Sequence, residues 1–469
     1  MARVENIEID SKKLLKSKDP SERSAAVASF MEEELDDETT ELLCELVEDR
    51  DKGVRNAVDM TLSYNPSRRI PKFLVKYISS PSIATRNLAG EILIKIGSRA
   101  VDAMLEYIDS GNDDDKKFLI DVLGLIGDKK PSQHILVLMN NCKNDNVILA
   151  CVEALGSLSC VESLDALLQF YERNELFKPT IIEALGKIGT KKALNFITSR
   201  YNEEDELTKF SMIESLGSVG DEESFFFLVS ELENTSGPIV WPIVNSIYNL
   251  KEKYNLDIPY DEKMKNALLQ TVNCGHEKYV NSAVHLITAF DDEETILTCI
   301  KVYGTNAEQD EIVKQKIFSH PQILFLALPD SIDNRSENIR SLLELVKEFA
   351  EGDREIFVKM LSNIQIRNLA DAFAKCLDDP DEEARRLAVE LLFTIDQGTA
   401  MLFIDKMVED DNLWNRLKLL EILSEVNSIE ANTALKKLAD DAEEMVNERA
   451  KFILSQRSAV QLETKTDNK

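Results

Sequence analysis

The stretch EALGKIGT, from Glu183 to Thr190, decides the fold because close copies of it recur along the chain. Each copy contains a leucine that lies among apolar residues at helical spacing. Successive leucines are 32, 30 and 31 residues apart. A period of this length indicates supersecondary units that stack on one another and share one core. The other copies are DVLGLIGD (Asp121 to Asp128), EALGSLSC (Glu153 to Cys160) and ESLGSVGD (Glu214 to Asp221), with the leucine at Leu123, Leu155, Leu185 and Leu216.

The register of the repeated leucine extends beyond these four copies. It runs backwards through Leu93, Leu62 and Phe30 and forwards to Tyr248. It resumes at Leu392 and Leu423, with a weak final copy around Leu454. The sequence therefore predicts repeat arrays at both ends of the chain, separated by a region that lacks the marker.

A residue that can cap a helix stands eleven positions before each marker. Short polar side chains there accept hydrogen bonds from the free N–H groups of a helix start, and glycine is tolerated. Each capped helix is about 12 residues long by its apolar spacing and is closed by a glycine such as Gly127 or Gly189. A further helical segment fills the space before the next cap, as over 161–174 and 191–202, so each unit is a helix pair. The caps are Asp19, Asp51, Ser82, Asn112, Asn144, Asn174, Asp205, Gly237, Asp381 and Asn412.

Strings such as EALGKIG, preceded by an Asx cap and a basic residue, resemble the short HEAT repeats, including the subclass similar to the repeats of bilin (phycobilisome) lyases. The resemblance covers residues 11–250 and 366–460. It implies an all-α fold, a right-handed α-solenoid of stacked HEAT-like helix pairs. It also implies that the second helix of each pair lines the concave side. HEAT repeats occur in scaffolds, adaptors and a few enzymes, so the resemblance leaves the function class open.

We expect four regions along the chain: about eight repeats over 1–250, degenerate helical repeats or an insertion over 251–365, further repeats over 366–460 and a polar, frayed tail over 461–469. Pro259, Pro321 and Pro329 indicate short connectors in the second region. Its helical segments are expected over 261–274, 277–289, 293–302, 308–319, 337–350 and 354–361.

The chain is strongly acidic, with 55 basic and 85 acidic residues and a formal charge of −30. This charge repels phosphate backbones and disfavours nucleic acid as a partner. No apolar run approaches the roughly 20 residues that cross a bilayer, and no signal-peptide pattern is present, so we expect a cytoplasmic protein. The cysteines lack a CxxC spacing and are expected to be free buried thiols. They are Cys44, Cys142, Cys151, Cys160, Cys274, Cys299 and Cys376.

A carboxylate stands two positions before the marker in most units. On stacked helices these carboxylates should form a row, which would attract a basic segment of a protein partner and speed its association. Local pairs with lysines four residues later, as at Glu91 with Lys95 and Glu183 with Lys187, would neutralise part of the row. The alternative is that glutamate is simply a good helix former at a solvated position. The carboxylates are Glu91, Asp121, Glu153, Glu183, Glu214, Glu390 and Glu421.

Seven positions before the marker most units carry a cation. The HEAT resemblance implies that this cation bonds to carboxylates or cap oxygens of the adjacent pair. Two positions break the column, Ile148 and Trp241. Trp241 could offer an aromatic surface to a partner, as tryptophan often does, or pack in the core. The cations are Arg23, Arg55, Arg86, Lys116, Lys178, Lys209, Arg385 and Arg416.

Motifs for catalysis or metal binding are absent from the sequence. The four histidines, at 134, 276, 285 and 320, show no HExxH spacing, and no GxxxxGK[ST], GxGxxG or GxSxG occurs. We therefore assign no catalytic, cofactor-binding or metal-binding residue and expect no cofactor.

Two function classes follow from these observations. The first is a non-catalytic scaffold or adaptor that binds a protein partner, with a basic segment, through the concave helix surface. Its expected partner-binding residues are Glu91, Asp121, Glu153, Glu183, Glu214 and Trp241. The alternative, suggested only by the repeat subclass, is an accessory or lyase-type enzyme acting on a bilin-like chromophore, with Glu153, Glu183 and Trp241 lining a pocket.

Overall fold

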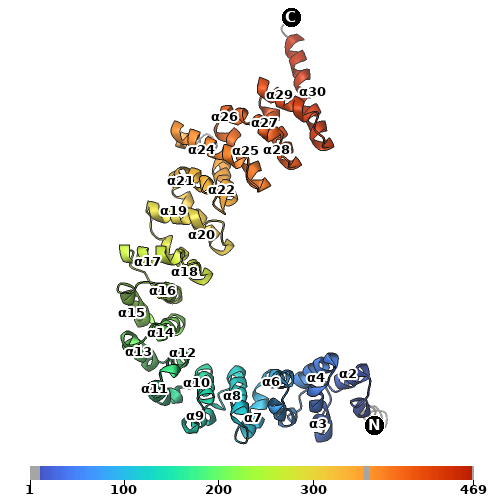
Figure 1. Ribbon diagram of the computed structural model, residues 1–469, viewed down its shortest axis with the longest axis vertical. Helices are drawn as coiled ribbons and strands as arrows, with labels where there is room; N and C mark the ends of the chain where they lie inside the picture. The colour runs from blue at the N-terminus through green and yellow to red at the C-terminus, as the bar shows by residue number, and fades with distance from the viewer. Residues whose placement is uncertain (1–10, 353–358, 467–469) are drawn as a thin grey trace. The chain divides into compact units, whose positions relative to one another are not determined.

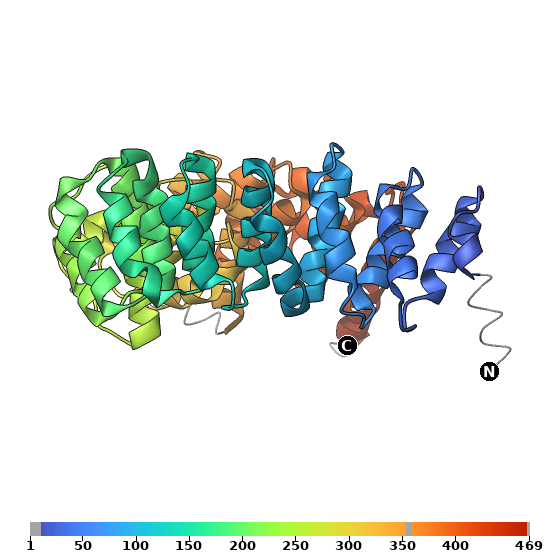
Figure 2. The same cartoon turned by 90° about the horizontal axis from the view of Figure 1, so that it is seen from below.

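The computed structural model describes residues 11–352 and 359–466. Every regular element within these ranges is a helix, and the helices follow one another as stacked pairs (Figures 1 and 2). The predicted all-α solenoid is thereby confirmed. The chain divides into two compact units, residues 1–258 (unit 1) and 259–469 (unit 2).

Unit 1 alternates first and second helices in the order that the repeat predicts. The first helices are α3 (Asp37–Glu45), α5 (Ile70–Leu74), α7 (Val101–Ile108), α9 (Ser132–Asn141), α11 (Leu164–Tyr171), α13 (Lys191–Arg200) and α15 (Glu222–Leu232). The second helices are α2 (Pro20–Ser29), α4 (Lys52–Tyr64), α6 (Ile83–Ile96), α8 (Asp113–Ile126), α10 (Asp145–Ser157), α12 (Lys178–Ile188), α14 (Glu206–Val219) and α16 (Val240–Tyr254). Short 3₁₀ helices join them: η1 (Leu46–Glu48), η2 (Val75–Ser79), η3 (Gly97–Ala100), η4 (Val161–Ser163), η5 (Glu175–Phe177) and η6 (Tyr201–Glu203).

Unit 2 is also built of helix pairs, including the stretch where the marker is lost. Five helices predicted for that stretch are present, and the sixth, over 354–361, falls mostly outside the described residues. The helices are α17 (Glu262–Val272), α18 (Glu277–Ile287), α19 (Glu293–Val302), α20 (Ala307–Phe318), α21 (Pro321–Asp333), α22 (Ile339–Gly352), α24 (Asn363–Cys376), α25 (Glu382–Ile395), α26 (Gln397–Leu402), α27 (Ile404–Val408), α28 (Leu413–Glu425), α29 (Ile429–Leu438) and α30 (Glu444–Thr466).

One expectation for unit 2 is wrong. Pro321 and Pro329 are not connectors, because Pro321 begins α21 and Pro329 lies inside it. Proline suits the first turn of a helix, and the loss of one backbone hydrogen bond at Pro329 is outweighed by burial of the apolar face that includes Leu324 and Leu328. Helix α30 continues to Thr466, within the segment expected to form a polar tail.

The predicted caps are confirmed at eight of the ten positions, where the side chain accepts a hydrogen bond from the first turn. Asn174 caps the 3₁₀ helix η5 rather than α12 itself. Gly237 is not a cap: its φ is +79°, and α16 begins three residues later at Val240. In unit 1 the cap column is therefore regular except at α12, where η5 intervenes, and at α16, where it is lost.

The second helices of unit 1 pack against one another at glycines. A Cβ on Gly186 would lie 2.8 Å from the Cβ of Ser215, and one on Gly217 would lie 2.5 Å from the Cβ of Ser246. Gly156 meets α12 in the same way, so each glycine lets the next second helix approach closely. Unit 1 is curved, and four of its second helices lie on the inner side of this curve (Figure 1): α8, α10, α12 and α14.

Serine hydroxyls fix the register between these helices. Ser215 donates to the carbonyl of Ile182 (3.3 Å), and Ser246 donates to the carbonyl of Ile213 (3.0 Å). Ser246 is thus the counterpart of Ser215, and the marker in α16 is the fully buried Ile247. The expected marker, Tyr248, is one residue out of register. Consequently Val240, and not Trp241, occupies the position of the basic column.

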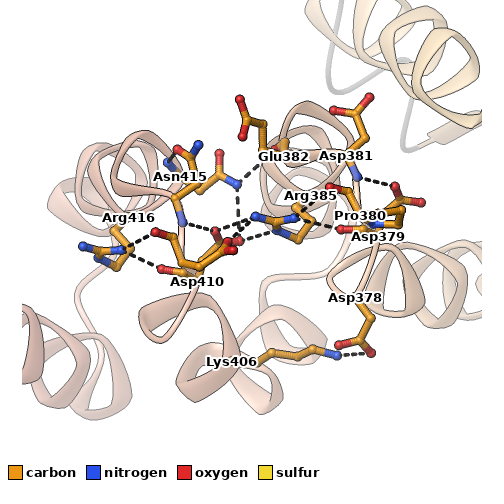
Figure 3. A network of polar contacts seen from close by, with 12 residues as sticks. Asp378, Asp379, Pro380, Asp381, Glu382, Arg385, Lys406, Asp410, Asn415 and Arg416 are labelled. Carbon is orange, nitrogen blue, oxygen red and sulfur yellow. Dashed lines mark hydrogen bonds and ion pairs between the residues drawn. The ribbon is translucent and has the colours of Figure 1, made fainter.

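The cations of that column tie consecutive repeats together. In unit 2, Arg385 donates to both carboxylate oxygens of Asp410 (2.9 and 3.1 Å) and to the carbonyl of Asp379 (2.8 Å; Figure 3). In unit 1, Arg23 contacts both oxygens of Asp49 at 2.7 and 2.8 Å. Asp410 and Asp49 each precede the next helix cap by two residues and accept from its backbone N–H. The structural role predicted for the basic column is confirmed at these positions.

The cysteines are free thiols, as expected, but two of the seven are not buried. Cys142 and Cys274 are half-buried, and each accepts a hydrogen bond from the backbone N–H two residues later. They lie in the short connections before α10 and α18, where a side chain reaches the surface.

Candidate functional site

The six residues predicted to bind a partner lie on six successive second helices of unit 1. Glu91, Glu153 and Glu183 are exposed, and Asp121, Glu214 and Trp241 are half-buried. Because the helices stack in register, the five carboxylates follow one another along a single layer. They belong in order to α6, α8, α10, α12 and α14, and Trp241 belongs to α16.

Two local pairings differ from the prediction. Lys95 does not pair with Glu91, because its ammonium group lies 2.7 Å from both carboxylate oxygens of Asp59 on the preceding second helix. Asp121 has no lysine four residues later, but it accepts a hydrogen bond of 2.8 Å from Lys117, one turn earlier. Within the row, Asp121 is therefore partly neutralised, whereas Glu91 does not share the charge of Lys95. We call the carboxylates of the next three second helices, Glu153, Glu183 and Glu214, the acidic row.

An apolar row runs beside the acidic row, one helical turn toward the N-terminus of each helix. Side chains four residues apart on a helix are neighbours, with Cβ atoms about 5–6 Å apart. At this position α8 carries Lys117, whereas the next four second helices carry apolar side chains. Phe210 is 40% exposed, and the other three are half-buried. The apolar row consists of Leu149, Pro179, Phe210 and Trp241.

Sequence reasoning missed the apolar row because it placed Trp241 in the basic column. The correct register was visible in the sequence, since VNSI (Val244 to Ile247) aligns with IESL (Ile213 to Leu216) through the shared serine. With that alignment, Trp241 falls 31 residues after Phe210 and becomes its counterpart.

A groove of about 530 Å³ lies between α12 and α14 and combines the two rows. Pro179 and Glu183 line one side, and Phe210 and Glu214 line the other. Gly186 and Ser215, the pair in close contact, also line it. Leu207, also in the lining, is 66% exposed. Such a groove can accept an apolar side chain while two carboxylates hold a cation beside it.

Within residues 11–352 and 359–466, no group of three or more His, Cys, Asp or Glu side chains is arranged to hold a metal ion. The same ranges contain no helix with both the length and the apolar character of a membrane-spanning segment.

Comparisons with known proteins show no family for this chain. No protein-family model matches the chain, and no curated protein matches it. Among solved structures, yeast importin-β (Kap95p) is similar with 11% identity, 97% of this chain and 74% of that chain covered, and a TM-score of 0.40. The structure of Kap95p bound to RanGDP is similar with 13% identity, coverage of 96% and 72%, and a TM-score of 0.45. The Kap95:Nup1 complex is similar with 11% identity, 97% of this chain and 74% of that chain covered, and a TM-score of 0.41.

Proposed function

We propose that this chain is a non-catalytic, protein-binding scaffold, and that the second-helix layer of unit 1 holds a basic segment of a protein partner. The observation that carries the proposal is the groove between α12 and α14, in which Glu183 and Glu214 stand beside Pro179 and Phe210. Carboxylates steer a basic partner and select against acidic ones, whereas partly exposed aromatic and aliphatic side chains supply contact energy.

The number of repeats supports binding over an extended surface rather than at one deep pocket. The acidic and apolar rows each place one side chain on every second helix from α10 to α14, and the apolar row reaches α16. Several modest contacts can then add up along the layer, with the affinity depending on a few central anchors such as Phe210.

The lyase-type alternative rests on the resemblance of the repeats alone. It predicts that added bilin changes its absorbance spectrum in the presence of the protein. The scaffold proposal predicts an unchanged spectrum.

Charge reversal tests the scaffold proposal. The probe is a fluorescein-labelled library of 12-residue peptides that contain Lys, Leu and Pro in random order, and binding is followed by fluorescence anisotropy. We expect Glu153→Lys, Glu183→Lys and Glu214→Lys together to weaken binding at least tenfold. Added salt should weaken binding to the unaltered protein, because exposed charges are screened.

The matched control reverses three carboxylates that lie outside the second helices, Glu106 in α7, Glu162 in η4 and Glu231 in α15, and therefore changes the net charge by the same amount. It should bind the library as the unaltered protein does. Equal losses in both triple variants, or equal binding of a library with Glu in place of Lys, would contradict the proposal.

A further inference from the structure

The two rows repeat with the spacing of the second helices, and this spacing restricts the conformation of the partner segment. Packed helices lie about 8–10 Å apart, depending on the side chains between them. Here the contacts are made by Gly156 with Ala184, Gly186 with Ser215 and Gly217 with Ser246, so little side-chain volume separates the helices. The spacing must therefore lie near the short end of this range.

Three regular backbones can be compared with that spacing. A β-strand points alternate side chains to opposite faces, so side chains on one face recur after about 6.4–6.8 Å, which is shorter than the spacing of packed helices. An α-helix laid across the layer returns side chains to the same face after three or four residues, about 5.4 Å further on, and again after seven residues, about 10.5 Å further on. A polyproline II helix returns every third side chain after about 9 Å. Polyproline II is the best match to helices packed through glycine.

A polyproline II segment also matches the presence of two parallel rows. Its residues i and i+1 occupy two adjacent faces, and each face repeats every third residue. One face can hold apolar side chains against Pro179, Phe210 and Trp241 while the next holds cations near the acidic row. Proline and aromatic surfaces suit such segments, and their preformed conformation lowers the entropy lost on binding.

We propose that unit 1 binds a polyproline II segment in which an apolar residue and an adjacent Lys or Arg recur every third residue. One apolar residue occupies the groove between Pro179 and Phe210, and others lie against Leu149 and Trp241 on the adjacent second helices. The cations lie beside Glu153, Glu183 and Glu214. This inference rests on the proposed function and specifies its partner.

The test compares two 12-residue peptides of identical composition. One is (Leu-Lys-Pro)₄, and the other contains the same residues in an order without a three-residue period. Trp241 serves as the reporter, because the chain has two tryptophans and Trp414→Phe removes the other. Trp414 is exposed, so this substitution is expected to leave the fold intact.

We expect the periodic peptide to bind at least tenfold more tightly than the scrambled one and to shift the emission of Trp241. Phe210→Ala should abolish most of this difference. The matched control Phe226→Ala, which removes an exposed aromatic ring from α15, should leave it unchanged.

The other possible outcomes contradict either the polyproline II inference alone or both proposals. Equal binding of the two peptides would overturn the polyproline II inference but leave the scaffold proposal standing. Tighter binding of a proline-free Lys–Leu peptide that becomes helical on binding would also overturn the inference. Failure of all three peptides to bind would contradict both proposals.

Discussion

The guanidinium of Arg416 donates hydrogen bonds of 2.8 and 3.0 Å to the two carboxylate oxygens of Asp441. A third bond, 2.7 Å long, goes to the carbonyl of Asp410, whose own carboxylate binds Arg385. Arg385 and Arg416 thus join the starts of their own helices to carboxylates in the connections before α28 and α30, respectively. This chain of bidentate contacts locks neighbouring repeats of unit 2 in register.

Removing the guanidinium should therefore destabilise unit 2 far more than removing a surface ion pair does. Arg416 is only 9% exposed, and Arg416→Ala leaves the carboxylate of Asp441 without its partner. We expect a loss of about 3–5 kcal/mol in the free energy of unfolding. Urea unfolding followed by circular dichroism, with hydrogen exchange to locate the effect in α28 and α29, measures this.

The control for that prediction is Lys191→Ala, which breaks the exposed pair with Glu223. It should cost less than about 1 kcal/mol. Similar losses for Arg416→Ala and Lys191→Ala would show that the buried contacts do not hold the repeats together.

The same contacts predict how stability depends on pH. Hydrogen bonds from Arg23 hold the pKa of Asp49 below its ordinary value. Burial alone would raise the pKa of Asp410, but hydrogen bonds from Arg385 and from the next cap outweigh it and lower the pKa. A carboxylate whose pKa is lower in the folded state stabilises the fold above its unfolded pKa of about 4, and this contribution disappears as the pH falls through the folded value.

We therefore expect the free energy of unfolding to be level above about pH 5 and to fall below about pH 4. Asp410→Asn should be less stable at pH 7 and should lose less on acidification, so the two curves converge at low pH. Parallel curves for the two proteins between pH 7 and pH 3 would rule out this origin of acid sensitivity.

Close packing at Gly217 can be tested by a double mutant cycle. In Gly217→Ala the new Cβ would lie 2.2 Å from the Oγ and 2.8 Å from the Cα of Ser246. Overpacking of this kind costs about 1–3 kcal/mol, against a gain of about 1 kcal/mol in helix propensity. Ser246→Gly in the same chain should restore part of the loss, which thermal unfolding would show as a non-additive effect. Strict additivity would place the two residues out of contact.

Thiol reactivity should distinguish the buried cysteines from Cys142 and Cys274, which lie in the connections before α10 and α18. Burial raises the pKa of Cys151 to about 12 and that of Cys376 to about 12, which suppresses the reactive thiolate. N-ethylmaleimide followed by mass spectrometry should label Cys142 and Cys274 in the native protein and the other five only after unfolding. Early labelling of Cys151 would contradict the packing of α10.

Features set by local sequence were predictable. The caps at Asp51 and Asn112 follow from one side chain and the N–H groups beside it, and the period follows from the repeated marker. Ion pairs between repeats could not be predicted in this way. Lys95 binds Asp59 on the neighbouring second helix, because the stacking of the helices brings that carboxylate within reach.

The candidate site was only partly predictable for the same reason. The acidic row follows from the marker, but the apolar row needs the register of α16 to within one residue. Taking Tyr248 as the marker of α16 instead of Ile247 assigned Trp241 to the basic column. This assignment concealed that Trp241 is the counterpart of Phe210. The hydroxyl bond from Ser246 to Ile213 settles that register in three dimensions.

The most direct test of the central claim, that the second-helix layer of unit 1 grips a protein partner, is photo-crosslinking at two matched positions. A benzophenone amino acid replaces Phe210 in one protein and Phe226 in the other, and crosslinked segments from native cells are sequenced by mass spectrometry. The account predicts that position 210 alone crosslinks to protein segments rich in Lys or Arg. Crosslinks from position 226 to the same segments, or from position 210 to acidic segments or nucleic acid, would contradict it.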